Sequence, residues 1–514
     1  MNVDGSGLTR AQLFRYGAGG GVAILAPGVL AACGGSKASA GGTIDFVYSD
    51  ANSKDNLDPA QSLSEATVIL NGMLYEGLVD ADADFNPKPL LAKDWSSTPD
   101  AKEWTFRLRD GVKFHDGKPL TARDVVFSLR RHLDESVGSA IQANLASVLS
   151  PNGVRAVDAT TVKLVLDRPN AFLLATLGLR QAQIIRDGTK KPDGNGTGPF
   201  KLKSFAPAQS FAVVKNENYW ASGRPYIDGV RGRYIRDSST KLQATLQGNA
   251  HITDSVDLAS LPLVERNRDV RLDRLRGNIY YSFGFDSKSS PFNDPQVIRA
   301  LQLATDRSGM VKTVFRDHAT VAYDIPVPEG SPYLPDSVVS GRTHDPEAAA
   351  ALLRKAGHTD LSFDLPTSQA GPGMVDLALI AKRDWEQAGI RVNVQQVPAE
   401  TYWTDVWHVR PRYVGWWANR HPYDSMVLAY ESKSTWNEGN YSNPRADALL
   451  RQVRGTTNEA EQERLMQELG AFVADTAPRV LPVFVDSLFV ARKQLTGVKY
   501  DYIRHIDFRN ARLA

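Results

Sequence analysis

The segment that decides the fold is a short run of alternating residues followed by two Asp-Gly pairs: Trp104-Thr105-Phe106-Arg107-Leu108-Arg109-Asp110-Gly111-Val112-Lys113-Phe114-His115-Asp116-Gly117. Apolar and polar residues alternate from Trp104 to Leu108, which is the pattern of a half-buried β-strand. Each Asp-Gly pair favours a tight turn, because glycine adopts the positive φ of such turns without steric cost. The segment therefore predicts a strand followed by exposed turns.

Strand patterns and helix patterns alternate on both sides of this segment. Period-two alternation predicts strands, and apolar residues three and four positions apart predict helices. The expected strands cover residues 43–48, 104–108, 161–166, 200–205, 390–397 and 482–490. The expected helices cover residues 65–74, 122–133, 294–304, 346–356, 377–388 and 459–474. Because both types occur throughout the chain, the predicted fold class is α/β, or mixed α+β, with mixed sheets.

Two of these helices carry recognisable start or stop signals. Thr121 followed by Asp124 predicts a capping box at the start of helix 122–133. Gly357 follows directly on helix 346–356, at the position where glycine commonly ends a helix.

Composition excludes several classes of function. The chain has 514 residues, of which 60 are basic and 58 acidic, so its net charge is +2. That balance gives no reason to expect a nucleic-acid partner. After the N-terminal segment, no run of about 18 apolar residues predicts a membrane span. The sequence contains neither a His-Glu-x-x-His zinc motif nor a Gly-x-Ser-x-Gly nucleophile motif. We therefore expect no enzyme activity, no cofactor and no bound metal ion.

The first 33 residues have the features of an export signal. Arg10 and Arg15 supply positive charge before an apolar, Gly- and Ala-rich stretch over residues 16–29, which is followed by Leu30-Ala31-Ala32-Cys33. Cys33 is the only cysteine, so it cannot form an intramolecular disulfide. The small residues before it resemble a bacterial lipobox. This resemblance implies that residues 1–33 are a signal peptide with a lipobox and that Cys33 is lipidated.

Export and membrane attachment follow from this interpretation. Two acyl chains on Cys33 are sufficient for stable anchoring, and the Gly-, Ser- and Ala-rich residues 34–42 would form a flexible tether. We expect the folded protein at the periplasmic or extracellular face of the cytoplasmic membrane. Residues 9–15 resemble a twin-arginine signal in which Ala11 replaces the second arginine. Both the Sec route and the twin-arginine route therefore stay open.

Residues 91–95 and residues 104–117 are the first of several blocks that carry a family resemblance. The blocks, found in the same order, resemble the family 5 extracellular solute-binding proteins of bacterial ABC importers, which include dipeptide, oligopeptide and nickel binders. The later blocks are Gly196-Thr197-Gly198-Pro199-Phe200, Asn216-Glu217-Asn218-Tyr219-Trp220, Pro291-Phe292-Asn293-Asp294, Ala304-Thr305-Asp306-Arg307, residues 349–357, and Asn443-Pro444 with Asp447. Together they span nearly all of residues 43–514. We interpret the Gly-rich loop 194–198 as a turn into strand 200–205, because it lacks the Lys-Ser/Thr ending of a nucleotide-binding loop.

The resemblance implies a two-lobed, periplasmic-binding-protein-like fold with an extra subdomain in the first lobe. The first lobe would comprise residues 43–285 and 487–514, with residues 75–197 as the extra subdomain, and the second lobe residues 286–486. Such a protein closes around a solute and delivers it to ABC permease and ATPase subunits, since the solute binds the closed state better. We expect a monomer.

The candidate ligand site lies in an aromatic part of the second lobe. Five of the nine tryptophans fall between Trp403 and Trp436, and aromatic faces stack on flat ligand surfaces or hold a cation. Residues 415–419, Gly-Trp-Trp-Ala-Asn, resemble the segment that contacts the ligand in peptide-binding members. For Trp403 and Trp407, core packing and ligand contact are equally open. The predicted ligand-binding residues are Gly415, Trp416, Trp417, Asn419, Arg420, Tyr423 and Trp403.

One departure from the family pattern bears on the ligand. Peptide-binding members carry an aspartate where this chain has Asn419, and that aspartate pairs with the α-ammonium of the ligand. Removing one partner of such a buried pair costs about 3–5 kcal/mol, so a peptide with a free N-terminus is disfavoured. The sequence leaves open whether a nearby carboxylate supplies the missing charge, the candidates being Glu400, Asp405, Asp424 and Glu431.

The expected function is capture of a peptide or peptide-like small polar solute. Arg420 makes an acidic and a neutral polar ligand equally credible. The alternatives are a sugar, an opine or a metal chelate bound by the same fold, and a sensor lipoprotein that does not take part in transport.

Overall fold

The computed structural model describes residues 41–82, 85–418, 420–501 and 506–514. The chain divides into two units, Met1–Lys37 and Ala38–Ala514, and the architecture below is that of the second unit. The predicted signal peptide, the lipidation site Cys33 and the predicted ligand residue Asn419 lie outside the described residues.

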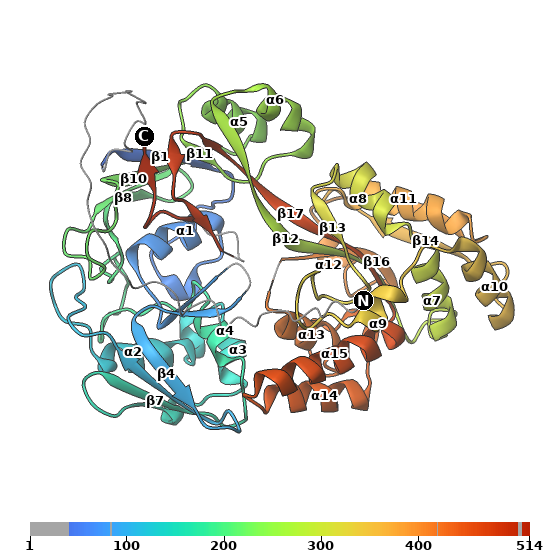
Figure 1. The fold of residues 1–514 in the computed structure, drawn as a ribbon, viewed down its shortest axis with the longest axis horizontal. Helices are drawn as coiled ribbons and strands as arrows, with labels where there is room; N and C mark the ends of the chain where they lie inside the picture. Colours follow the sequence, from blue (N-terminus) through green and yellow to red (C-terminus); the bar gives the residue numbers. More distant parts are fainter. Residues whose placement is uncertain (1–40, 83–84, 419, 502–505) are drawn as a thin grey trace, which may run out of the picture. The chain divides into compact units, whose positions relative to one another are not determined.

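Helices and strands alternate along the unit, as Figure 1 shows. The helices are α1 Glu65–Leu74, α2 Ala122–His132, α3 Gln142–Ala146, α4 Leu173–Leu177, α5 Ser238–Leu246, α6 Leu261–Arg266, α7 Pro295–Ala304, α8 Arg307–Phe315, α9 Asp336–Ser340, α10 Pro346–Ala356, α11 Met374–Glu386, α12 Tyr402–Asp405, α13 Pro422–Tyr430, α14 Pro444–Arg454 and α15 Glu459–Thr476. The strands are β1 Thr43–Tyr48, β2 Val79–Ala81, β3 Pro87–Pro89, β4 Ala92–Ser97, β5 Glu103–Leu108, β6 Val154–Ala156, β7 Thr161–Val165, β8 Phe200–Ala206, β9 Ser210–Lys215, β10 Gly229–Tyr234, β11 Ile252–Thr253, β12 Val270–Phe285, β13 Ala319–Val321, β14 Ser362–Thr367, β15 Arg391–Gln396, β16 Arg412–Ala418, β17 Arg479–Arg492, β18 Leu495–Thr496, β19 Lys499–Tyr500, β20 Ile506–Asp507 and β21 Arg512–Leu513.

The largest sheet is mixed. Its strand order is β16-β12-β17-β11-β1-β10-β9-β8, with β13 also paired to β17. Strand β1 runs parallel to β10 and β11, whereas β12 runs antiparallel to β16 and β17. The predicted α/β class with mixed sheets is therefore confirmed.

The long strands β12 and β17 contribute to two separate hydrophobic cores. Leu275 of β12 and Phe489 of β17 pack with β1, α1 and β8. Tyr281 of β12 and Val483 of β17 pack instead with α7, α8, α10 and α11. The paired strands run side by side between these two groups of elements in Figure 1, so each group is packed around its own interior and the strands join them.

The segment 104–117 forms a strand and two turns, as predicted. Strand β5 lies between β4 and β7 in a four-stranded sheet, and Phe106 is fully buried in the core under α2. Gly111 and Gly117 have φ values of +74° and +86°, which the turns require. The predicted capping box of α2 is also confirmed, since the side chain of Asp124 accepts from the backbone N–H of Thr121 at 2.7 Å.

The Gly-rich loop 194–198 packs against the end of α1. A Cβ atom added at Gly196 would lie 2.0 Å from the carbonyl oxygen of Leu74, and one added at Gly198 would lie 2.4 Å from that of Met73. Nε2 of the His115 ring donates to the carbonyl oxygen of Gly198 at 3.1 Å, and its Nδ1 accepts from the backbone N–H of Gly196 at 3.3 Å. The loop leads into β8, and its glycines serve this close packing.

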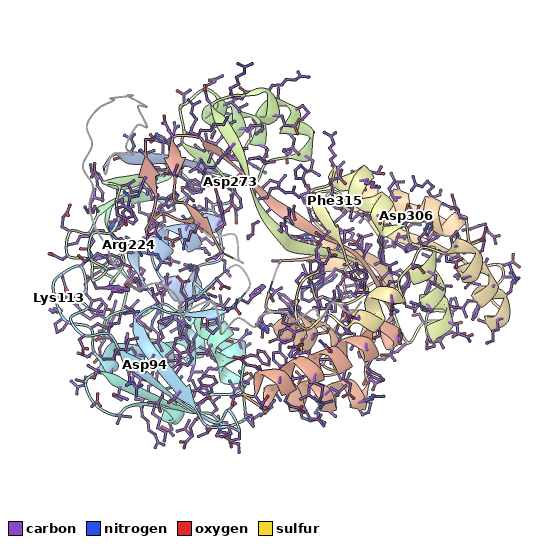
Figure 2. The ribbon with its side chains drawn as sticks, in the orientation of Figure 1. Asp94, Lys113, Arg224, Asp273, Asp306 and Phe315 are labelled. Atoms are coloured by element: carbon purple, nitrogen blue, oxygen red, sulfur yellow. The ribbon has the colours of Figure 1, made fainter. Side chains whose placement is uncertain are left out.

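Helix α8 illustrates how the second core is built. Its N-cap is Asp306, whose carboxylate accepts from the backbone N–H of Gly309 at 2.8 Å. Phe315 ends the helix and packs on Tyr281 with ring centroids 5.7 Å apart; Asp306 and Phe315 are both labelled in Figure 2.

Most of the expected elements are present, with shifted ends in some. Helix α11 begins at Met374, three residues before the predicted start, after Gly373 with a φ of +79°. Strand β17 extends beyond both ends of the predicted strand 482–490. The local sequence pattern predicts neither β12 nor β16, because Arg-rich and aromatic residues interrupt the alternation there. Within the described part of the chain, no helix combines the length and the apolar character that crossing a bilayer requires.

Candidate ligand-binding site

Strand β16 holds three of the predicted ligand residues. It pairs with β12 so that Gly415 faces Ser282, Trp416 faces Tyr281 and Trp417 faces Tyr280. Successive side chains of a strand point to opposite faces, so Trp416 packs on the core around α11 and Trp417 packs in the small core with Tyr280. Trp417 is 3% exposed.

Five tryptophans form one continuous group, which we call the tryptophan cluster: Trp403, Trp407, Trp416, Trp417 and Trp436. Neighbouring rings in it meet edge to face, with centroids 5.6 to 6.1 Å apart. Trp403 is 36% exposed and Trp436 is 42% exposed. The cluster therefore has a buried base at Trp417 and an accessible aromatic edge that could stack on a solute.

Trp403 and Trp407 do not share one helix. Helix α12 is a single turn that ends at Asp405, and the backbone leaves the helical region at Val406. The two indole rings still meet, with centroids 6.1 Å apart.

A buried ion pair lies beneath the tryptophan cluster. Oε1 of Glu438 accepts from Nε1 of Trp417 at 2.9 Å and from Nε1 of Trp407 at 3.2 Å. The other carboxylate oxygen of Glu438 pairs with the Arg479 guanidinium. Burial acts to lower the pKa of Arg479, but the Glu438 carboxylate offsets it and the net shift is upward.

This ion pair is fully enclosed. Glu438 and Arg479 are each 2% exposed. The Arg479 guanidinium also donates to the hydroxyls of Ser282, at 3.1 Å, and Tyr430, at 3.2 Å. The sequence analysis does not single out either residue, and no local pattern marks them as partners. Together they fix the orientation of two indoles of the cluster.

Arg420 lies over two rings of the tryptophan cluster. Its guanidinium carbon is 5.6 Å from the ring centroid of Trp417 and 5.4 Å from that of Trp436. Its Nη1 donates to the carbonyl oxygen of Ala418 at 3.3 Å. Burial lowers the pKa of Arg420, and burial also raises the pKa of Asp424 to about 6.

Tyr423 packs in a hydrophobic cluster with α14 and α15. It is 4% exposed and stacks on Phe172 with centroids 4.1 Å apart. His421 is the N-cap of α13 and accepts from the backbone N–H of Tyr423 at 3.2 Å. Burial lowers the pKa of His421 to about 4, so its ring is neutral near pH 7.

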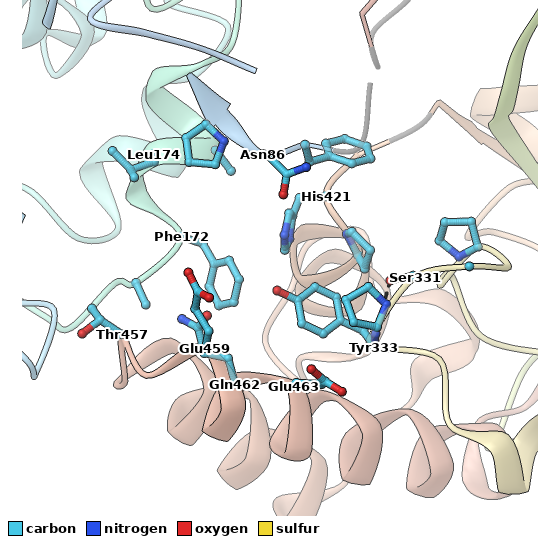
Figure 3. Close-up of a pocket in the computed structure, with 18 of the residues that line it drawn as sticks. Asn86, Phe172, Leu174, Ser331, Tyr333, His421, Thr457, Glu459, Gln462 and Glu463 are labelled. Atoms are coloured by element: carbon cyan, nitrogen blue, oxygen red, sulfur yellow. Dashed lines mark hydrogen bonds between the residues drawn. The ribbon is translucent and has the colours of Figure 1, made fainter. Parts of the chain in front are cut away.

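A cavity of about 1270 Å³ opens beside His421. Figure 3 shows Phe172, His421 and Tyr333 around it, with Glu459 and Glu463 of α15 along one side. One part of the lining comes from residues 85–87, 95–97, 104, 171–172 and 174–175, and the other part from residues 276–277, 320, 328–333, 421–422, 457, 459 and 462–463. Among the described residues, the predicted ligand residues 403, 415–417, 420 and 423 are not part of the lining. Along the chain, Arg420, which lies over two rings of the tryptophan cluster, directly precedes His421 and Pro422, which line the cavity.

The chemistry available here is that of binding. Aromatic faces, a guanidinium and a neutral imidazole offer stacking and hydrogen bonding to a polar solute. In the described residues, no three His, Cys, Asp or Glu side chains gather in a group able to hold a metal ion.

Comparison with known proteins gives a family and a set of relatives. A family model described as "Bacterial extracellular solute-binding proteins, family 5 Middle" matches residues 86–439. The glutathione-binding protein GsiB of Escherichia coli (strain K12) is 26% identical over 479 residues, which cover 88% of this chain and 91% of the relative.

Solved structures agree in fold. AgaA from A. tumefaciens R10, in complex with agropinic acid, superposes with a TM-score of 0.73 at 24% identity, covering 92% of this chain and 99% of that chain. DppA from Helicobacter pylori, in complex with the peptide STSA, superposes with a TM-score of 0.74 at 21% identity, covering 92% of this chain and 98% of that chain. Structural neighbours of this kind are two-lobed periplasmic binding proteins, which confirms the predicted two-lobed fold.

Proposed function

The chain belongs to family 5 of the bacterial extracellular solute-binding proteins, and from that premise we propose that it captures a peptide or peptide-like small polar solute between two lobes and delivers it to an ABC permease. Its homologues are binding proteins rather than enzymes. The proposal therefore assigns the protein no catalytic role.

The observation that carries this proposal is the cavity beside His421. Its lining comes both from residues 85–104, within the proposed extra subdomain, and from residues 328–333 and 457–463, within the proposed second lobe. Its volume of about 1270 Å³ is somewhat above the roughly 300–1,000 Å³ of common small-molecule sites. A solute with the size of a short peptide would fit there.

Closure around the solute would use β12 and β17 as the hinge. We propose the first lobe as residues 43–285 with 487–514, including the subdomain 75–197, and the second as residues 286–486. Two hydrogen bonds join the proposed subdomain to the proposed second lobe: the backbone N–H of Ala171 donates to the carbonyl oxygen of Arg454 at 2.9 Å, and Thr457 Oγ1 donates to that of Pro99 at 3.4 Å. Ring contacts of Phe85 and Phe172 with His421, and of Phe172 with Tyr423, add to them. Few such contacts would break when the lobes open, as a hinge motion requires.

Attachment at the membrane is part of the same proposal. A signal peptide over residues 1–33 and lipidation at Cys33 would hold the monomeric binding protein next to its permease and ATPase partners. The residues after Cys33 would act as the tether.

The proposed ligand class rests on the ligands of similar proteins and on this chain's own residues. GsiB is named for glutathione, and the two solved structures hold agropinic acid and a peptide. Asn419 in place of an aspartate argues against a free-amine peptide, so we place a peptide-like solute first. A sugar, another opine or a metal chelate is the alternative ligand, and a sensor role is the alternative to transport.

Thermal shift of the mature protein, residues 34–514, against matched panels of peptides, opines, oligosaccharides and metal chelates tests the proposal. We expect one panel to raise the melting temperature, with a dissociation constant near 1 μM, about −8 kcal/mol. The variant Trp403→Ala should weaken that binding because it removes part of the exposed aromatic edge. Leu379→Ala, which changes an exposed residue on α11 (50% exposed), is the matched control. Absence of a shift with every panel would refute the proposal, and import assays with the permease and ATPases separate transport from sensing.

A further inference from the structure

Within the described residues, most hydrogen-bond donors of the Arg420 guanidinium have no partner. A guanidinium carries five N–H donors, and a single hydrogen bond is formed within the described residues, from Nη1 to the carbonyl oxygen of Ala418 at 3.3 Å. No described carboxylate lies within 4.0 Å of it. The charge of Asp424 acts on Arg420 from farther away.

The Arg420 guanidinium also contacts the tryptophan cluster. Its guanidinium lies over two indole rings, Trp417 and Trp436, at 5.6 and 5.4 Å from their centroids. A cation–π contact of this kind uses the charge of the guanidinium and leaves its N–H bonds free to donate. The edge of the group is then available to a planar anion, which it binds through two parallel hydrogen bonds.

Two other arginines of the same part of the chain provide a comparison. Arg445 lies 4.7 Å from the ring centroid of Phe472 and pairs with Glu468 at 3.2 Å. Arg479 lies 5.4 Å from the ring centroid of Tyr280 and pairs with Glu438. Arg420 combines the same aromatic contact with partial burial but has no carboxylate at ion-pair distance. A partly buried charge is stabilised by a counter-charge, and here none of the described side chains supplies one at ion-pair distance, since Asp424 acts only from farther away.

We propose that the solute carries a carboxylate and that the edge of the Arg420 guanidinium binds it beside the tryptophan cluster. This inference rests on the proposed function and specifies its ligand class. Because Arg420 covers Trp417 and Trp436 with a positive charge, a cationic solute is repelled there and finds these two aromatic faces occupied. A neutral solute leaves the guanidinium without its anionic partner.

The test uses two series of probes that differ in charge on a constant skeleton. The peptide series is N-acetyl-alanyl-alanine, its C-terminal amide, and alanyl-alanine amide, which are anionic, neutral and cationic at pH 7. The sugar series is glucuronate, glucose and glucosamine. Affinities are measured by titration calorimetry and melting-temperature shift for the full mature chain, and for the variants Arg420→Gln, Arg420→Lys and Arg445→Gln.

The expected result is that the anionic member binds at least tenfold more tightly than its neutral partner in one of the series. Arg420→Gln should abolish that preference, and Arg420→Lys should retain part of it, because lysine keeps the charge but not the planar fork. Arg445→Gln is the control and should bind as the wild type does. The melting temperature of each variant without probe shows whether it is folded.

Two results would overturn the inference and leave the proposed function standing. One is tighter binding of a neutral or cationic probe than of its anionic partner. The other is an unchanged preference for the anion in a folded Arg420→Gln protein. If no probe of either series binds the wild-type protein, the proposed capture of peptide-like or sugar-like solutes fails, and this inference fails with it.

Discussion

Replacing Arg479 with methionine tests whether the buried ion pair stabilises the proposed second lobe and its tryptophan cluster. Methionine is close to arginine in length but has no charge, so the substitution leaves the Glu438 carboxylate without its cation. Glu438 would keep the two indole hydrogen bonds from Trp417 and Trp407, at 2.9 and 3.2 Å. Those two bonds do not replace a cation for a carboxylate that is 2% exposed.

The expected loss is large because one partner of a buried pair remains. Removing one member of such a pair costs about 3–5 kcal/mol, and we expect a value in this range for Arg479→Met. The double variant Glu438→Gln with Arg479→Met removes both charges, so its loss should fall below the sum of the two single losses by at least about 2 kcal/mol. Arg445→Met is the control, because Arg445 and Glu468 form an exposed pair whose side chains are 61% and 37% exposed. We expect it to cost less than about 1 kcal/mol.

Urea unfolding followed by tryptophan fluorescence measures these free energies, and the fluorescence of the cluster reports on the part of the protein concerned. If Arg479→Met cost no more than the Arg445→Met control, the assignment of a stabilising role would be wrong. Additive losses in the double variant would also refute it, because two charges that act as a pair cannot contribute independently.

The remaining predictions concern lipidation and pH. Cys33→Ser should leave the protein unlipidated, and unchanged membrane retention and mass of the variant would contradict the lipobox assignment. His132 is 2% exposed, and its burial lowers its pKa from 6.5 to about 4. As the pH falls below 6.5 the unfolded chain takes up this proton first, so the burial of His132 lowers the free energy of unfolding by up to about 3 kcal/mol between pH 6.5 and 4. His132→Asn should flatten the decline of the unfolding free energy over that window. An unchanged slope would contradict this role of His132. Burial raises the pKa of Asp424 from 3.8 to about 6, so its contribution to stability is complete below pH 3.8 and is lost as the pH rises through 6. Asp424→Asn should therefore raise the melting temperature at pH 8 relative to wild type and have little effect at pH 3.5, and the reverse pattern would contradict this account.

Local features of the fold could be predicted where the determining residues are close in sequence. Helix α1 spans Glu65–Leu74, as expected from its apolar spacing. Helix α10 ends at Ala356 before Gly357, whose φ of +78° explains the stop signal. Strand β5 and its turns follow from the alternation and the Asp-Gly pairs. In each case, the pattern and the capping residue lie within about one helical turn or one hairpin of each other.

Features that depend on distant parts of the chain could not be predicted in this way. Arg479 of β17 lies opposite Gly284 of β12, and the turn that carries Glu438 is held just after β12, where the backbone N–H of Ser287 donates to the carbonyl oxygen of Gly439 at 2.8 Å. Strand β16 also pairs with β12, and no local pattern shows these long-range pairings. The same pairings bring Trp417 over that ion pair. Tyr423 was expected to contact ligand from its place in the sequence, but its burial against Phe172 depends on a residue of the proposed extra subdomain. Its ligand role stays a prediction.

The most direct test of solute capture is native mass spectrometry of the mature protein after gentle purification from its own host. The account predicts one small polar molecule bound per chain, released with its mass unchanged when the protein is denatured, and bearing a carboxylate if the inference on Arg420 holds. A protein that carries no such molecule and binds none when incubated with host extract, or one that converts the added solute into a different mass, would contradict capture without chemistry.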